Sequence, residues 1–161
     1  MKVRTVPLAF LIVLIFAASA LAQAQTPQQT LQQYVADLQR NPSDDDLRQK
    51  IIALVQPMSP PPALPADVHE MVGRAAYAIK NASSEADFLA AAEAYGKALQ
   101  LAPWVADYYF NQGVAYEKAK RYDEAIAAFN WYLKAAPNAK GADQVHERIG
   151  GLKYAKESIR R

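Results

Sequence analysis

The chain has 161 residues, a formal net charge of +2 and an apolar content of 52%, enough for one globular domain or a short array of repeats. It contains no cysteine, which excludes disulfides, thiolate metal sites and lipoprotein attachment. With 6 glycines and no alternating runs of β-branched residues, the composition favours helices over strands.

The first 22 residues have the features of a signal peptide. Lys2 and Arg4 form a short positive region, residues 8–21 are almost wholly apolar, and Ala20 and Ala22 are small residues at the positions that a signal peptidase reads. We expect cleavage after Ala22 and export, in a bacterium to the periplasm. A retained membrane anchor is the alternative, but about 14 apolar residues in a helix reach only roughly 21 Å, short of a hydrocarbon core of about 30 Å.

The charge balance changes when this segment is removed. Cleavage takes away two of the 18 basic residues, which leaves as many basic as acidic residues. A near-neutral protein has no electrostatic basis for binding nucleic acid or an anionic membrane as its main partner. We therefore expect neither as a partner, and membrane contact only through the transient signal peptide.

Residues 23–56 are expected to form an N-terminal helical hairpin. The first helix is predicted over residues 27–40, with Thr26 as its N-cap and Pro27 in its first turn. Its apolar residues follow the i, i+3, i+4, i+7 spacing of one helix face: Leu31, Tyr34, Val35 and Leu38. Asn41-Pro42 ends this helix.

The second helix of the hairpin is expected to start with Ser43 as its cap. Asp44, Asp45 and Asp46 then lie in the first turn, where the helix dipole favours negative charge. The triplet lacks the alternating ligands, the glycine and the distant glutamate of a calcium loop, so helix-start electrostatics explains it better. Its predicted apolar stripe is Leu47, Ile51, Leu54 and Val55.

A proline-rich linker is predicted over residues 57–65. This stretch holds half of the 10 prolines of the chain, and such a run favours a semi-rigid polyproline II spacer. It could also be a ligand for an aromatic groove, but a spacer between two helical blocks explains it without a further role.

Beyond the linker, residues 66–161 are expected to form a second, larger helical domain. Helices are predicted over residues 66–81, 87–101, 104–119, 122–135 and about 139–160. Their connections are short, so successive helices should be antiparallel neighbours.

An internal repeat is the strongest signal in the chain. Four residues recur in one register 34 residues later: Ala91, Tyr95, Ala98 and Pro103 return as Ala125, Phe129, Tyr132 and Pro137. Upstream of the second set, Gly113 lies between Tyr109 and Tyr116. Gly113 would let two helix backbones approach closely, while the aromatic residues fill the space around it.

This pattern resembles the tetratricopeptide repeat family, most clearly over residues 106–139. Tyr109 stands at the usual Trp position, Gln112 departs from the usual Leu, and Tyr132 from a usual small residue. The other family positions are occupied as expected: Gly113, Tyr116, Ala125, Phe129 and Pro137. The resemblance implies an all-α fold, a short right-handed α-solenoid of helical hairpins with a C-terminal capping helix from about residue 139.

The preceding unit matches this pattern only in its second half. Its first helix, with Gly73 and Tyr77, aligns only if about three or four residues are inserted around residues 83–85. Two repeats are fewer than such arrays usually need, so the capping helix, the N-terminal hairpin or a partner is expected to supply further contacts.

No arrangement in the sequence supports catalysis, a metal or a cofactor. His69-Glu70 and His146-Glu147 resemble the start of a zinc-protease motif, but Gly73 and Gly150 stand where the second histidine would be. Gly96-Lys97 lacks the preceding glycine of a phosphate-binding loop. We therefore expect a non-enzymatic protein.

The resemblance also implies a binding surface for a protein or peptide partner. In the family, the concave groove is lined by the first helix of each repeat, and the corresponding residues are Asp107, Phe110, Val114, Glu117 and Lys118. The alternative is that Phe110 and Val114 pack on the first helix of the previous repeat. The expected function is an exported scaffold or adaptor.

Two other functions stay open. One is a self-associating or docking structural subunit of a cell-envelope complex, which would use the N-terminal hairpin for docking and could be a homo-oligomer. The other is an accessory subunit of an envelope enzyme.

Overall fold

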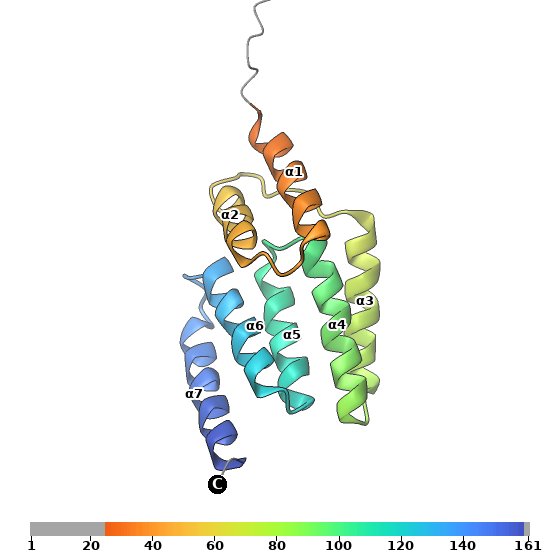
Figure 1. Ribbon diagram of the computed structural model, residues 1–161, viewed down its shortest axis with the longest axis vertical. Helices are drawn as coiled ribbons and strands as arrows, with labels where there is room; N and C mark the ends of the chain where they lie inside the picture. The colour runs from red at the N-terminus through yellow and green to blue at the C-terminus, as the bar shows by residue number, and fades with distance from the viewer. Residues whose placement is uncertain (1–24, 160–161) are drawn as a thin grey trace, which may run out of the picture.

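The computed structural model describes residues 25–159, and within that range it is all-helical, with seven helices and no strand. The predicted signal peptide, residues 1–22, lies outside the described range, as do Arg160 and Arg161. The helices are α1 (Pro27–Arg40), α2 (Asp45–Val55), α3 (Ala66–Asn81), α4 (Glu85–Leu101), α5 (Ala106–Lys118), α6 (Tyr122–Ala135) and α7 (Ala142–Ile159). Figure 1 shows α3 to α6 side by side, with α7 at one edge.

Side-chain hydrogen bonds define the starts of α1 and α2. Thr26 and Gln29 form a reciprocal capping box at α1, as expected from the Thr26-Pro27 pair. The cap of α2 is Asp44 and not Ser43, because the Asp44 carboxylate accepts a hydrogen bond from the Leu47 amide at 2.8 Å. The expectation for Ser43 was therefore wrong by one residue.

The bounds of α4, α5 and α7 differ from those predicted. The Ser84 hydroxyl and the Asp87 carboxylate form a capping box, so α4 begins at Glu85 and not at 87. A turn closed by the Val105 amide and the Ala102 carbonyl delays α5 to Ala106. A similar turn before Ala142 delays α7 by three residues relative to the predicted start at 139. The predicted ranges of α1, α3 and α6 are confirmed.

The main core lies between α3, α4, α5, α6 and α7 and is rich in aromatic side chains. Tyr95 of α4, Tyr109 of α5 and Phe129 of α6 are buried in it. Gly113 lets α5 and α6 approach closely, because a Cβ at this position would lie 2.7 Å from the Phe129 ring. The expected close packing at Gly113 is confirmed, but an aromatic ring and not a second backbone lies against it.

Gly73 and Tyr77 of α3 do not take part in close helix packing. No atom lies within 4 Å of a Cβ built at Gly73, and the Tyr77 side chain is 71% exposed. The residues of α3 that face the core are instead Val68 and Ala75, both fully buried. The alignment of Gly73 and Tyr77 with the packing positions of α5 therefore does not describe α3.

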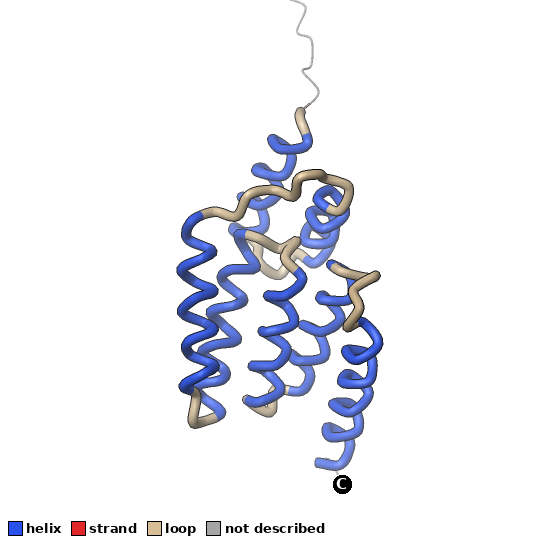
Figure 2. Tube along the Cα trace, turned by 180° about the vertical axis from the view of Figure 1, so that it is seen from behind, coloured by secondary structure: helices blue, strands red, loops and turns tan. Residues whose placement is uncertain are grey.

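The N-terminal hairpin has a small core of its own and lies across one end of α4, α5 and α6 (Figure 1). Its core consists of Leu31, Leu38, Ile51 and Val55. Trp104 packs partly against this cluster and partly against the main core, which links the two. Figure 2 shows the long loop that leads from α2 across the top of the molecule to α3. Within residues 25–159, no helix is both long and apolar enough to cross a membrane.

Candidate functional site

The five residues predicted to bind a partner follow α5 from its first turn to its last. Asp107 and Lys118 are exposed, whereas Phe110, Val114 and Glu117 are half-buried. Phe110 and Val114 pack against the main core. The two charged ends are therefore more accessible than the apolar middle of this row.

Phe110 is held by aromatic residues of α6. Its ring meets the Phe129 ring edge-on at a centroid distance of 5.7 Å and lies 5.6 Å from the Tyr132 ring. The Arg148 guanidinium of α7 lies 6.0 Å from the Phe110 centroid. The alternative expectation placed Phe110 against the first helix of the preceding unit, which is α3, but its aromatic contacts lie toward α6 and α7.

An ion pair joins the last turn of α5 to α7. Arg148 Nε donates to Glu117 Oε2 at 2.5 Å, with both side chains about one-third exposed. The same guanidinium lies 5.4 Å from the Phe129 ring. Arg148 thus contacts both Glu117 of α5 and Phe129 of α6.

A hollow of about 470 Å³ lies between α5 and α7 beside this ion pair. Glu117 and Lys118 line it from α5, and Gly151 and Leu152 from α7. Lys118 Nζ lies 5.3 Å from the Phe88 ring and forms no ion pair with the carboxylates of residues 25–159. Two of the five predicted residues therefore line one hollow, and Asp107, Phe110 and Val114 are not among its lining residues.

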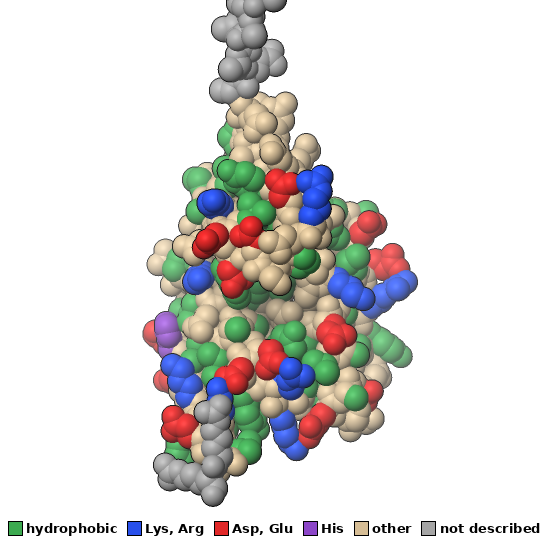
Figure 3. Space-filling model, in the orientation of Figure 1, with side chains coloured by type: hydrophobic (Ala, Val, Ile, Leu, Met, Phe, Trp, Pro, Cys, Tyr) green, Lys and Arg blue, Asp and Glu red, His purple; other side chains and the backbone are tan. Residues whose placement is uncertain are grey.

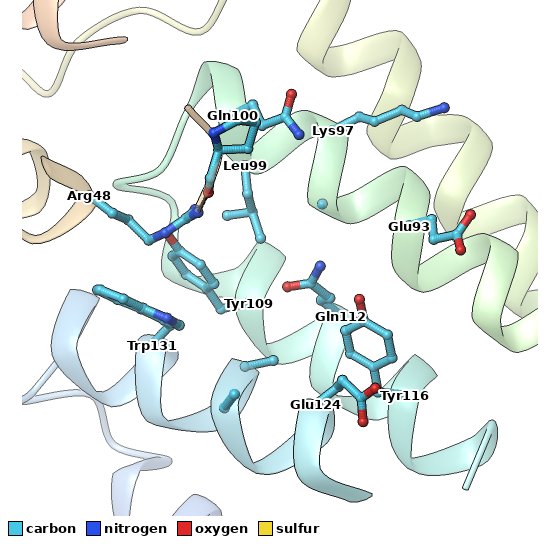
Figure 4. Close-up of a pocket in the computed structure, with 14 residues that line it drawn as sticks. Arg48, Glu93, Lys97, Leu99, Gln100, Tyr109, Gln112, Tyr116, Glu124 and Trp131 are labelled. Atoms are coloured by element: carbon cyan, nitrogen blue, oxygen red, sulfur yellow. Dashed lines mark hydrogen bonds between the residues drawn. The ribbon is translucent and has the colours of Figure 1, made fainter. Parts of the chain in front are cut away.

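A second groove, which the sequence did not indicate, runs over α5 between α4 and α6 and encloses about 490 Å³ (Figure 4). Leu99, Ala128 and Trp131 supply apolar surface, and Gln100 and Gln112 supply amides. The Gln112 amide donates to the Ala92 carbonyl at 3.2 Å. The groove is therefore held together across α4 and α5 by a hydrogen bond as well as by packing.

Arg48 of α2 closes one end of this groove and joins the hairpin to the larger helical block. Its side chain is 12% exposed, and Nη2 donates to the Pro42 carbonyl at 2.5 Å. The guanidinium lies 5.5 Å from the Trp131 ring, while Arg48 Nε has no hydrogen-bond partner among the described residues. A nearly buried cation is thus held by the Pro42 carbonyl, by the Asp45 carboxylate at 3.6 Å and by an aromatic face.

Trp131 is the centre of this junction. Its ring stacks on the Tyr109 ring at a centroid distance of 6.1 Å, and Lys134 Nζ lies 4.2 Å from its centroid. No sequence pattern predicts this cluster, because Arg48 and Trp131 are 83 residues apart and belong to no common motif.

The tyrosines in the groove stay protonated at neutral pH. Burial raises the pKa of Tyr109 to about 12 against a partial opposing effect of Arg48, and its hydroxyl donates to the Pro103 carbonyl at 2.9 Å. Burial also raises the pKa of Tyr116, and the nearby Glu124 and Glu93 carboxylates add to this shift. These phenols can donate hydrogen bonds, but neither is activated as a base or nucleophile.

The charged side chains of the described residues are dispersed. His69 and His146 are both exposed, and no group of three or more His, Cys, Asp or Glu residues in residues 25–159 is placed to hold a metal ion. Figure 3 shows acidic and basic side chains interspersed over one face.

Comparison of the chain with known proteins found no matching family model, no matching curated protein and no matching solved structure.

Proposed function

We propose that this protein is an exported, non-enzymatic scaffold of the tetratricopeptide repeat type that binds a segment of a partner protein between α5 and α7. The observation that carries this proposal is the hollow of about 470 Å³ beside Glu117 and Lys118. Its size is in the range of ligand sites, roughly 300–1,000 Å³. It would take a short segment of a partner rather than a whole domain.

The repeat assignment rests on matched positions in two helix pairs. Tyr95 and Phe129, 34 residues apart, are both buried, and so are Ala91 and Ala125. Residues at matched positions thus face the core in each pair, as an array of similar units requires. We propose on this basis a short right-handed solenoid with α7 as its cap.

The lining of the hollow suggests what the partner segment presents. Leu152 and Ala155 supply apolar surface. The Lys118 ammonium, which lies over the Phe88 ring of α4 and has no carboxylate partner in residues 25–159, would turn into the hollow on binding. A segment with an apolar side chain and a neighbouring acidic group would satisfy both parts of this lining. The Glu117–Arg148 pair would stay intact at the edge of the hollow.

Two adjacent glycines of α7 provide a matched test. No atom lies within 4 Å of a Cβ at Gly150 or at Gly151, but only Gly151 lines the hollow. Leucine at either position should improve helix propensity by about 0.5–1 kcal/mol. Gly151→Leu should therefore fill the hollow without unfolding the protein, and Gly150→Leu controls for the added apolar surface.

The experiment is affinity capture from the exported fraction of the native host with tagged wild type and the two variants. We expect Gly150→Leu to recover the same partner as wild type, and Gly151→Leu to lose at least about nine-tenths of it, which corresponds to roughly 1.4 kcal/mol of binding free energy. Equal recovery by both variants would reject the hollow as the binding site.

A further inference from the structure

Helix α3 forms one edge of the molecule, and its outer face is uncovered. Figures 1 and 2 show α3 and α7 at opposite edges of the larger helical block. The core-facing side of α3 is defined by Val68 and Ala75, which places the opposite side in solvent. The exposed residues along that side are Ala66, His69, Glu70, Gly73, Tyr77, Lys80 and Asn81.

This face combines small residues with one large aromatic side chain. Tyr77 is 71% exposed and is one of three large apolar side chains that are exposed among the described residues. Nothing lies within 4 Å of a Cβ built at Gly73. A neighbouring helix could therefore approach closely at Gly73 and cover the Tyr77 ring.

The pattern of this face is complementary to itself. In an antiparallel pair of identical helices, residues at equal distances on either side of the two-fold axis meet each other. Gly73 and Tyr77 are equally distant from Ala75, and so are Glu70 and Lys80. An axis beside Ala75 would therefore set Tyr77 over Gly73 of the second copy and Lys80 beside Glu70 of the second copy.

The charged residues are available for this contact. Glu70 is 65% exposed and pairs with Arg74 on the same helix, which leaves its second carboxylate oxygen free of ion pairs within the described residues. Lys80 forms no ion pair with any carboxylate in residues 25–159. Each dimer would form this Glu–Lys pair twice because of its symmetry.

We propose that a second copy of this chain docks on the outer face of α3, as an antiparallel two-fold helix pair centred on Ala75. One helix face buries less surface than the roughly 1,600 Å² of a standard interface, so the dimer is weak and reversible. It leaves the hollow between α5 and α7 at the opposite edge of the block open, and each dimer then presents two such hollows.

Sedimentation velocity of the wild-type protein over micromolar to millimolar concentrations tests the proposal. We expect the weight-average mass to rise from that of a monomer toward that of a dimer. Glu70→Lys sets like charges opposite each other at both symmetric contacts, and so does Lys80→Glu. Each variant alone should dimerise at least about tenfold more weakly than wild type.

Mixing the two variants is the decisive step. In a heterodimer, the lysine introduced at position 70 faces the glutamate introduced at position 80, and the native Lys80 and Glu70 face each other at the second contact. Mixing should therefore restore dimerisation to about the wild-type level. The matched control is the pair Glu93→Lys and Lys97→Glu on the exposed side of α4, which should leave dimerisation unchanged.

A second variant separates dimerisation from folding. Gly73→Leu has open space in the monomer but would collide with Tyr77 of the second copy. We expect its thermal stability to rise slightly while dimerisation is lost. A monomeric wild type at every concentration would overturn the proposal, as would a dimer that survives Gly73→Leu and both charge reversals.

Discussion

The helix pairs α3–α4 and α5–α6 differ most in their first helices. In α5–α6, Gly113 allows the Phe129 ring to lie against the backbone of the facing helix. In α3–α4, the buried small residue of the first helix is Ala75, and the glycine of that helix, Gly73, faces solvent. The second helices are alike, because Tyr95 and Phe129 are both buried.

The two pairs therefore differ in what their first helices contribute to the core. The second helix of each pair supplies a large core side chain, and the first helix of the second pair adds the buried Tyr109 and the close contact at Gly113. The first helix also differs in its outer side. A hollow separates α5 from α7, which packs on α6, whereas α3 presents an uncovered face. The two surfaces proposed for binding thus both arise from first helices.

The largest expected effect comes from removing the ring that closes the second pair. Phe129→Ala should lower the free energy of unfolding by about 3–5 kcal/mol, because it opens a cavity beside Gly113 and removes the aromatic contact of Phe110. Chemical denaturation measures this change. Phe129→Leu, which keeps most of the side-chain volume, should lower the free energy of unfolding clearly less. An equal loss in both variants would show that the ring is not closely packed.

The two glycines should respond in opposite directions to the same substitution. Gly113→Ala should destabilise the protein by about 1–3 kcal/mol, because the new Cβ meets the Phe129 ring at 2.7 Å. Gly73→Ala should stabilise it by about 0.5–1 kcal/mol, because the added methyl group meets nothing and helix propensity improves. Thermal unfolding of the two variants checks this contrast, which changes of the same sign would contradict.

These contrasts also show what could be derived from the sequence. The roles of Gly113 and Phe129 followed from spacing within one motif, and the bounds of α1, α3 and α6 from periodicity and flanking prolines or turns. The alignment of Gly73 with Gly113 was wrong because a glycine at roughly the right place in a helix does not reveal which face of the helix it occupies. Only packing distinguishes it from Ala75.

The groove closed by Arg48 was beyond sequence reasoning for a different reason. Arg48 stands three, four and seven residues before the buried Ile51, Ile52 and Val55, so helix spacing places it on the buried face of α2, whereas its charge favours solvent. Its burial against Trp131 depends on how the hairpin docks on α6, which is a long-range contact. The cap of α2 was missed for a local reason, since Ser43 and Asp44 are both good capping residues and adjacent.

Alkaline pH should destabilise the folded state through the buried phenol of α5. The pKa of Tyr109 is about 12 in the folded protein and 10.0 as its ordinary value. The stabilisation is therefore complete below pH 10 and is lost as the pH rises from 10 to 12, by about 2 kcal/mol. Denaturation at pH 9 to 12 measures this loss.

Tyr109→Phe is the control for this pH dependence. Without an ionisable group at this position, the loss of stability between pH 10 and 12 should be smaller than in wild type. The variant should be less stable than wild type below pH 10, because it lacks the hydrogen bond to Pro103. An unchanged pH dependence would show that Tyr109 is not the group responsible.

The smallest expected effect concerns the turn between α5 and α6. Lys120 has a φ of 56°, a left-handed conformation that favours glycine. Lys120→Gly should therefore stabilise the protein by about 0.5–1 kcal/mol despite the loss of its exposed ion pair with Glu85. Thermal unfolding checks this, and Lys118→Gly within the helix should instead destabilise by a similar amount.

Site-specific photo-cross-linking in the native host tests whether a partner segment lies between α5 and α7. A photoreactive residue replaces Lys118 in the hollow, or Lys97 on α4 as the control. We expect a discrete adduct with one partner protein from position 118 and none from position 97. An adduct from position 97 alone, or none from position 118 while the partner is still captured, would contradict it.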